Sequence, residues 1–161
     1  MSGVKAKPAQ PPTLRDAGWR IVFRLGFRLA RIWWRLRRPR QEGALVAIYV
    51  GRALLVVRSS YRVTWNFPGG AVRRGETPEA AALREVAEEI GLIVHSLRSA
   101  GLVCGNWGGR RTRVHFFELH LDQLPELQLD NRVIIAAQLV SPDELRSLAV
   151  TGPVAAYLRQ T

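Results

Sequence analysis

Hydrophobic and polar residues follow a helical period near the start of the chain. Arginines recur every three or four positions from Arg20 to Arg38, which places them along one face of an α-helix. A second face collects aliphatic residues at the same spacing, namely Val22, Leu25, Leu29, Ile32 and Leu36. Tryptophan and phenylalanine side chains widen that face, and Pro39 cannot continue a helix. The pattern predicts a basic amphipathic helix over residues 19–38, preceded by a polar, proline-bearing tail up to about Pro12 that we expect to be mobile.

From Gly43 onward the pattern changes to short apolar runs separated by turn residues, which is typical of strands. Strands are predicted at 44–50, 53–58, 92–97, 101–107, 114–121 and 133–140. Thr77 and Pro78 predict the start of a helix that Gly91 ends, and Ser141 predicts the start of a shorter one. The sequence therefore predicts an α/β domain at 43–161 behind a separate leader at 1–42.

Composition and charge narrow the class of protein. With 47% hydrophobic and 23% charged residues, the chain can bury a core, which excludes a wholly disordered chain or a collagen-like repeat. The net charge of +11 is concentrated in residues 1–42, which carry eleven basic and two acidic residues, a balance of +9. A lone Cys104 in apolar surroundings predicts a small buried side chain and favours a reducing, cytoplasmic location.

The leader helix has an arginine stripe beside a broad apolar face, which suits a helix lying on an anionic membrane surface. We therefore expect residues 19–38 to hold the chain at the inner face of a membrane, with guanidinium groups on lipid phosphates, and not to span it. Alternatively, the apolar face packs on the following domain or on a second subunit in a homodimer, leaving the arginines in water. Nucleic acid is less favoured, because phosphate binding does not require so many aliphatic residues. An organellar transit peptide is a further alternative, since the leader is rich in arginine and poor in acids.

The helix predicted at 78–90 carries the candidate chemistry. Glu85, Glu88 and Glu89 share one face, while apolar side chains gather on the opposite one. Like charges at this spacing repel one another, and a divalent cation reverses that repulsion. Oxygen ligands suit Mg²⁺ or Mn²⁺, and no histidine or cysteine spacing favours zinc. His95, His115 and His120 are scattered, and we expect structural or solvent-facing roles for them.

Fixed residues around this helix form a longer motif. From Gly70 the chain reads five residues, Glu76, seven residues, Arg84-Glu85, aliphatic Val86, one residue, Glu88-Glu89, one residue, Gly91 and aliphatic Leu92. This spacing resembles the Nudix box at every fixed position. The resemblance extends more loosely from Gly43 to about Tyr157.

The resemblance implies a Nudix-type α/β/α sandwich with a mixed β-sheet. It also implies a hydrolase that uses Mg²⁺ or Mn²⁺ to cleave a phosphoanhydride in a nucleoside diphosphate derivative or a related organic pyrophosphate. The implied metal ligands are the Gly70 carbonyl, Glu85, Glu88 and Glu89, with Glu88 or Glu89 as general base. Glu76 and Arg84 would form a buried pair that supports the box, together with Gly91.

Residues outside the box bear on the substrate. Arg58, Trp107 and Arg110 are candidates to bind a nucleotide-type small molecule, by stacking or by contacting an anion. Many Nudix hydrolases carry an acidic residue early in the last strand, where this chain has Val133, so Asp130 or Glu118 would have to substitute. The alternatives are a non-catalytic nucleotide-binding Nudix module and an RNA 5′-end pyrophosphohydrolase, with a diphosphate isomerase ranked lower.

Overall fold

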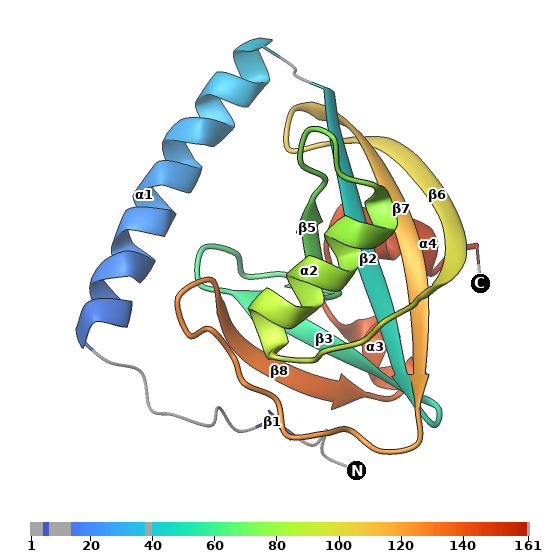
Figure 1. The fold of residues 1–161 in the computed structure, drawn as a ribbon. Coiled ribbons are helices and arrows are strands. Elements are labelled where there is room, and N and C mark those ends of the chain that lie inside the picture. The colour runs from blue at the N-terminus through green and yellow to red at the C-terminus, as the bar shows by residue number, and fades with distance from the viewer. Residues whose placement is uncertain (1–4, 7–13, 38–39, 161) are drawn as a thin grey trace.

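The computed structural model describes the backbone of residues 5–6, 14–37 and 40–160, and the side chains of residues 15, 17–27 and 41–160. The elements are β1 (Lys5–Ala6), α1 (Leu14–Arg37), β2 (Arg40–Val50), β3 (Ala53–Ser59), β4 (Trp65–Asn66), β5 (Gly69–Ala71), α2 (Pro78–Ile90), β6 (Arg98–Trp107), β7 (Arg110–Leu121), β8 (Ile134–Val140), α3 (Pro142–Ser147) and α4 (Gly152–Tyr157). They form an α/β fold with a separate helix at the start (Figure 1).

The described strands build one mixed sheet. The strand order is β1-β8-β3-β2-β7-β6, with β4 added to β3 and β5 added to β2. β2 runs parallel to β7, while its pairings with β3 and β5 are antiparallel. Because β2 lies in the middle of the sheet and pairs with β5, it holds the Gly69–Ala71 segment directly before α2.

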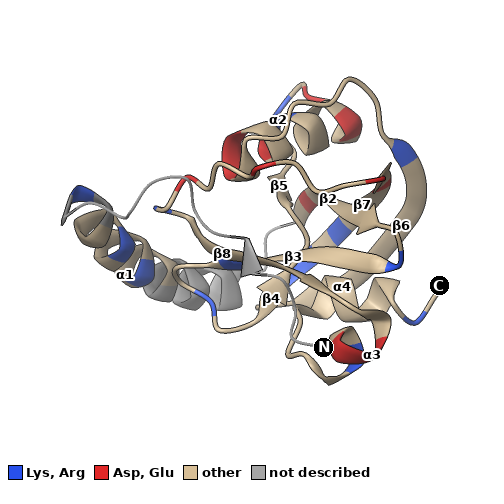
Figure 2. Cartoon of the chain, turned by 90° about the horizontal axis from the view of Figure 1, so that it is seen from below, with Lys and Arg blue, Asp and Glu red and all other residues tan. Residues whose placement is uncertain are grey.

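Helices cover both faces of this sheet (Figures 1 and 2). On one face, Ala81, Ala82, Val86 and Ile90 of α2 pack on apolar residues of β2, β3 and β8. On the other face, α3 and α4 contribute Leu145, Val154 and Tyr157 to a second cluster with Phe67 and Phe116. The predicted α/β/α sandwich with a mixed sheet is confirmed.

Local sequence explains where α2 begins and ends. The Thr77 hydroxyl accepts a hydrogen bond from the Ala80 amide at 3.2 Å, which caps the first turn. Gly91 ends the helix with a φ of 71°, a left-handed conformation that glycine adopts without strain. Since the apolar face of α2 is buried in the sheet, the glutamates face away from the core.

The strand predicted at 92–97 is wrong, because this segment pairs with no described strand and β6 begins only at Arg98. Leu92 and Leu97 pack on the α2 side of the core, while Ile93 is 76% exposed. The Leu97 amide donates to the Glu79 carboxylate at 3.3 Å and not to a strand. The apolar run is thus a connection that packs against α2.

Cys104 is exposed, which contradicts the prediction of a buried side chain. β6 is an edge strand of the described sheet, and successive side chains on a strand point to opposite faces. Val103 takes the buried position, so its neighbour Cys104 points outward.

The leader differs in part from its prediction. Within the segment expected to be a mobile tail, Lys5 and Ala6 form a strand opposite Gln138 and Ala137 of β8, and the rest of that tail lies outside the described residues. The α1 helix forms and ends at Arg37, two residues before Pro39. In the described part of the chain, no helix has the length and apolar character needed to cross a membrane.

Candidate active site

A short loop joins β5 to the acidic face of α2. Gly69 has a φ of 135°, and a Cβ there would lie 2.2 Å from the Ala44 carbonyl oxygen, so the position requires glycine. Its amide donates a hydrogen bond of 2.9 Å to the carboxylate of Glu89. The close packing of this loop on β2 therefore fixes the position of one of the predicted catalytic residues.

Glu89 is the most perturbed carboxyl group of the site. The pKa of Glu89 is raised from 4.5 to about 8, chiefly by burial and to a lesser extent by the negative charges of Glu85 and Asp130, against the lowering effects of the Gly69 amide and Arg62. A buried carboxylate beside two others is unfavourable without a compensating positive charge. The site therefore favours either a proton or a cation at Glu89.

Arg84 connects the box loop to the helix. Its Nε donates to Oε1 of Glu76 at 2.8 Å, and its Nη2 donates to Oε2 of the same carboxylate at 3.0 Å. The hydrogen bonds from Arg84, followed by one from the Arg73 amide, lower the pKa of Glu76 to about 2. This two-point contact holds residues 73–76 against α2.

The remaining donors of Arg84 reach two predicted metal ligands. Its Nη1 donates to Glu85 at 2.7 Å and to Glu88 at 3.2 Å. Glu85 is mostly buried, while the Glu88 side chain is 52% exposed and lies within 3.7 Å of Arg73. Arg84 therefore neutralises part of the charge that the helix face carries.

The donor set on this face is compatible with a hard divalent cation. Glu85 lies beside Gly70, and Glu89 is hydrogen-bonded to Gly69. A Cβ at Gly70 would sit 2.6 Å from the Glu85 carboxyl carbon, so glycine leaves room for that group. Among the described residues, no three His, Cys, Asp or Glu side chains converge closely enough to form a metal-binding group. The residues present fit Mg²⁺ or Mn²⁺ by their chemistry, and closing around an ion would require Glu85 or Glu88 to turn away from Arg84.

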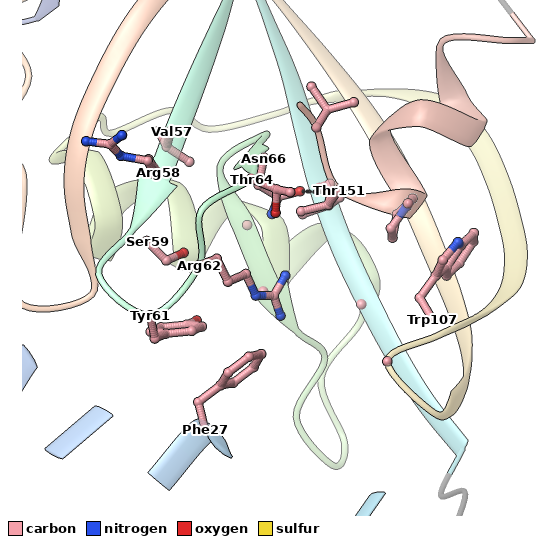
Figure 3. A pocket seen from close by; sticks show the side chains of 18 of the residues that line it. Phe27, Val57, Arg58, Ser59, Tyr61, Arg62, Thr64, Asn66, Trp107 and Thr151 are labelled. Carbon is pink, nitrogen blue, oxygen red and sulfur yellow. Dashed lines mark hydrogen bonds between the residues drawn. The ribbon is translucent and has the colours of Figure 1, made fainter. Parts of the chain in front are cut away.

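A cavity of about 1210 Å³ opens beside Glu89. Its wall combines Gly69 and Gly70 of the box loop with side chains from several elements (Figure 3). Polar side chains in this wall include Arg24, Arg58, Arg62, Asn66, Arg110 and Thr151. The volume exceeds the roughly 300–1,000 Å³ common for small-molecule sites.

The predicted substrate residues lie in this wall. Arg58, Trp107 and Arg110 all line the cavity, together with Gly70 and Glu89 of the box. Glu85 and Glu88 lie on the adjoining helix face. Gly91 lies at the far end of α2, where it caps the helix, and Glu76 and Arg84 support the loop from outside.

Sequence reasoning missed several polar residues of the wall, among them Arg24, Asn66 and Thr151. The Thr151 hydroxyl donates to the Asn66 side chain at 2.7 Å, a contact between positions 85 residues apart. Arg62 stands in a basic stretch of the sequence, but only the folded chain brings it close to the box. No local pattern distinguishes these residues from ordinary loop positions.

The cavity wall is strongly cationic (Figure 2 shows the charged positions). Among the described residues, the wall contains four arginines and one acidic residue, Glu89. Burial, followed by the positive charge of Arg62, lowers the pKa of Arg110. Two guanidinium groups that destabilise each other favour an anion between them. The surroundings of the cavity thus favour a negatively charged ligand.

Comparison with known proteins identifies the family. The family model described as NUDIX domain matches residues 39–159. The chain belongs to the Nudix family. Its match covers β2 to β8, the box and the helices α2 to α4, and leaves β1 and α1 outside.

Two curated relatives of this Nudix chain are similar over shorter stretches. An 8-oxo-dGTP diphosphatase from Proteus vulgaris is 42% identical over 53 residues, which are 33% of this chain and 47% of that protein. A U8 snoRNA-decapping enzyme from Homalodisca vitripennis is 28% identical over 92 residues, 55% of this chain and 49% of that protein. The chain spans about half the length of these curated relatives.

Solved structures share the Nudix fold. The MutT protein from Methanosarcina mazei Go1 has a TM-score of 0.68 at 19% identity, covering 76% of this chain and 93% of that one. At this identity the likeness shows the fold alone.

Asp130 and Glu118 were the two candidates to replace the acidic residue that this Nudix chain lacks at Val133, and the structure shows where each lies. Asp130 accepts hydrogen bonds from the amides of Val133 and Ile134, the latter at 2.7 Å, and its charge acts on Glu89. Glu118 instead accepts a hydrogen bond from the Tyr157 hydroxyl at 2.6 Å and pairs with Arg98. Of the two, Asp130 is the one that lies near the candidate site.

Proposed function

We propose that this Nudix protein is a divalent-metal-dependent hydrolase that cleaves a phosphoanhydride bond in a nucleoside diphosphate derivative or a related organic pyrophosphate. The observation that carries the proposal is the position of Glu89. It is a buried carboxylate on the acidic face of α2, and it also lines a cavity with four arginines. Glu89 therefore joins the acidic face, whose carboxylates suit a metal ion, to the cavity, whose arginines suit phosphate groups.

The box residues would hold Mg²⁺ or Mn²⁺ through Glu85, Glu88, Glu89 and the Gly70 carbonyl. A bound divalent ion neutralises phosphate charge and makes a water molecule more acidic. Without metal, Arg84 holds the Glu85 and Glu88 carboxylates close together on the helix face, since its Nη1 donates to both. The pairing of β5 with β2 keeps Gly70 beside Glu85.

The remaining residues bind the substrate and move a proton. Arg58, Arg62 and Arg110 would hold the phosphate oxygens, and Trp107 offers an aromatic surface for a base. Glu89 lines the cavity, whereas Glu88 is half exposed on the outer part of the helix face. This difference favours Glu89 as the group that accepts the proton of the attacking water.

The names of the relatives suggest which substrates to test. We would incubate the full chain with Mg²⁺ or Mn²⁺ and a panel of nucleoside triphosphates, including 8-oxo-dGTP, with ADP-ribose, dinucleoside polyphosphates, nucleotide sugars and 5′-triphosphorylated RNA. Products are resolved by mass. We expect selective cleavage that Glu89→Gln abolishes and that the exposed control Glu126→Gln retains.

Two results would contradict this proposal. Cleavage that Glu89→Gln leaves unchanged would show that the box does not perform the reaction. Binding of nucleotides without turnover, in a folded chain that binds metal, would favour the non-catalytic nucleotide-binding module. Selective cleavage at 5′-triphosphorylated RNA would assign the RNA-end alternative, which the decapping relative supports.

We further propose that α1 holds the protein, as a peripheral cytoplasmic protein, at an anionic membrane surface. In the described part of α1, Ile21, Val22 and Leu25 are 55–59% exposed, and Trp19 is 48% exposed. These large apolar side chains suit insertion between lipid headgroups. The positive charge concentrated in residues 1–42 favours anionic lipid.

The orientation of α1 corrects two expectations. Arg20 and Arg24 do not project away from the domain: their Nε atoms donate to the carbonyl oxygens of Asn131 and Ser60, each at 2.9 Å. The alternative in which the apolar face packs on the domain holds for Phe27, whose ring contacts Tyr61, but not for Ile21, Val22 and Leu25, which are exposed. These two arginines therefore bind backbone carbonyl groups of the domain through their Nε atoms.

Flotation with vesicles tests the membrane proposal. We expect the full chain to float with vesicles that contain phosphatidylserine, and the variant Val22→Glu/Leu25→Glu to remain in the soluble fraction. Ile93→Glu is the control, because Ile93 is an exposed apolar residue away from α1. Equal flotation of all three proteins would contradict the proposal.

A further inference from the structure

The α1 helix contributes side chains to the same cavity as the Nudix box. Arg24 and Phe27, one helical turn apart, line the cavity together with Gly69, Gly70 and Glu89. Figure 3 shows Phe27 rising from α1 toward Tyr61 and Arg62. The family match begins at residue 39, so this part of the wall comes from outside the Nudix domain.

Phe27 is in contact with the loop that follows β3. Its ring centroid lies 4.8 Å from that of Tyr61, and the guanidinium carbon of Arg62 lies 5.2 Å from the Phe27 centroid. The same guanidinium carbon lies 5.6 Å from the Tyr61 centroid. Two aromatic rings therefore restrict the position of Arg62.

Arg24 strengthens the same contact from the next turn of the helix. Its Nε donates to the Ser60 carbonyl, two residues before Arg62. The Ser60 hydroxyl and the Nε of Arg62 are both buried and have no hydrogen-bond partner among the described residues. These unpaired groups at the cavity wall favour a polar ligand.

Arg62 also acts on two other charged groups of the cavity wall. Arg62, Arg110 and Glu89 line the same cavity. An anion placed between Arg62 and Arg110 would relieve their repulsion next to the carboxylate of the box. Phe27 therefore contacts an arginine that lines the same cavity as Glu89.

We propose that α1 forms one wall of the substrate site, and that Phe27 is a positioning residue that holds Arg62 as a clamp for the phosphate groups of the substrate. This inference rests on the proposed function for the identity of the ligand as a polyphosphate. The two faces of the helix thus differ in their surroundings. Arg24 and Phe27 line the cavity, whereas Val22 and Leu25 are exposed on the outer side.

Binding of inorganic pyrophosphate without divalent metal tests this proposal separately from catalysis. Calorimetric titration of the full chain is expected to show that Phe27→Ala weakens binding about tenfold, and that Arg62→Gln weakens it at least as much. Phe27→Tyr keeps an aromatic ring in place and should restore binding to within about twofold. Val22→Ala, on the opposite face of α1, should bind as the unaltered chain does.

A double variant shows whether Phe27 acts through Arg62. If it does, Phe27→Ala has little further effect in a chain that already carries Arg62→Gln. An equal loss in both backgrounds would overturn this route, and unchanged binding by Phe27→Ala would overturn the role of α1 altogether. The absence of pyrophosphate binding in the unaltered chain would also overturn it. None of these results depends on hydrolysis, so a failure of this inference is distinct from a failure of the proposed function, which Glu89→Gln tests.

Discussion

Replacing Glu89 with glutamine should stabilise the metal-free protein at alkaline pH. Burial is the chief cause that raises the pKa of Glu89 from the ordinary 4.5 of a glutamate to about 8 in the folded chain. Between these values the folded state retains a proton that the unfolded state has released. The stability that the protonated carboxyl contributes is therefore complete below pH 4.5 and is lost as the pH rises through 8.

The size of the effect follows from the two pKa values. The rise from 4.5 to about 8 corresponds to a free-energy difference of about 5 kcal/mol over the whole titration, of which about 4 kcal/mol falls between pH 5 and pH 9. Glutamine stays neutral over this range and retains an oxygen that accepts the Gly69 amide. The Glu89→Gln chain should therefore become more stable than the unaltered chain by about 4 kcal/mol on going from pH 5 to pH 9.

Urea unfolding in EDTA, followed by tryptophan fluorescence at pH 5 and pH 9, measures this difference. The exposed control Glu126→Gln should show the same pH dependence as the unaltered chain. Excess Mg²⁺ should reverse the order at pH 9, because metal stabilises only the chain that retains the Glu89 carboxylate. A difference between Glu89→Gln and the unaltered chain that does not change with pH would refute the burial argument.

Three further substitutions test other parts of the account. Gly70→Ala places a Cβ 2.6 Å from the Glu85 carboxyl carbon, so calorimetry should show Mn²⁺ affinity reduced about tenfold; unchanged affinity would contradict the ligand assignment. Arg84→Lys cannot form the two-point contact with Glu76, and the cleavage rate should fall about 100-fold while the circular dichroism spectrum is retained. Phe116→Ala removes a fully buried ring stacked on Tyr157 at 4.5 Å, and urea unfolding should show a loss of about 3–5 kcal/mol; a loss below about 1 kcal/mol would contradict the described core.

The parts of the site that the sequence predicted depend on local spacing. The α2 helix begins at Pro78 and ends at Ile90, because the cap residues Thr77 and Gly91 act on their immediate neighbours. The same short range places three carboxylates on one face and brings Arg84 against Glu76. A fixed motif of this kind is read from the chain because its geometry is that of a single loop and helix.

The cavity wall depends on contacts between distant positions. Arg24 meets the Ser60 carbonyl across 36 residues, and Arg20 meets Asn131 across 111. The periodicity of α1 correctly predicts a helix with a basic and an apolar face, but it does not say which face meets the domain. That choice depends on carbonyl groups in the loops around β3 and β8, whose positions only the folded sheet sets.

The incorrect strand at 92–97 has a similar origin. An apolar run predicts burial, and Leu92 and Leu97 are indeed packed on the core. Burial against α2 satisfies those side chains as well as pairing in the sheet would, and Gly91 turns the chain away before a strand can form. Hydrophobic pattern alone does not distinguish between these two kinds of burial.

The central claim, that the acidic face of α2 directs water onto a phosphoanhydride, is tested most directly by isotope transfer. The substrate accepted from the panel is cleaved in H₂¹⁸O with Mg²⁺, and both products are analysed by mass. The account predicts one ¹⁸O atom in one of the two products, formed by the unaltered chain and not by Glu89→Gln. Cleavage without incorporation of ¹⁸O, or labelled product at an unchanged rate from Glu89→Gln, would contradict it.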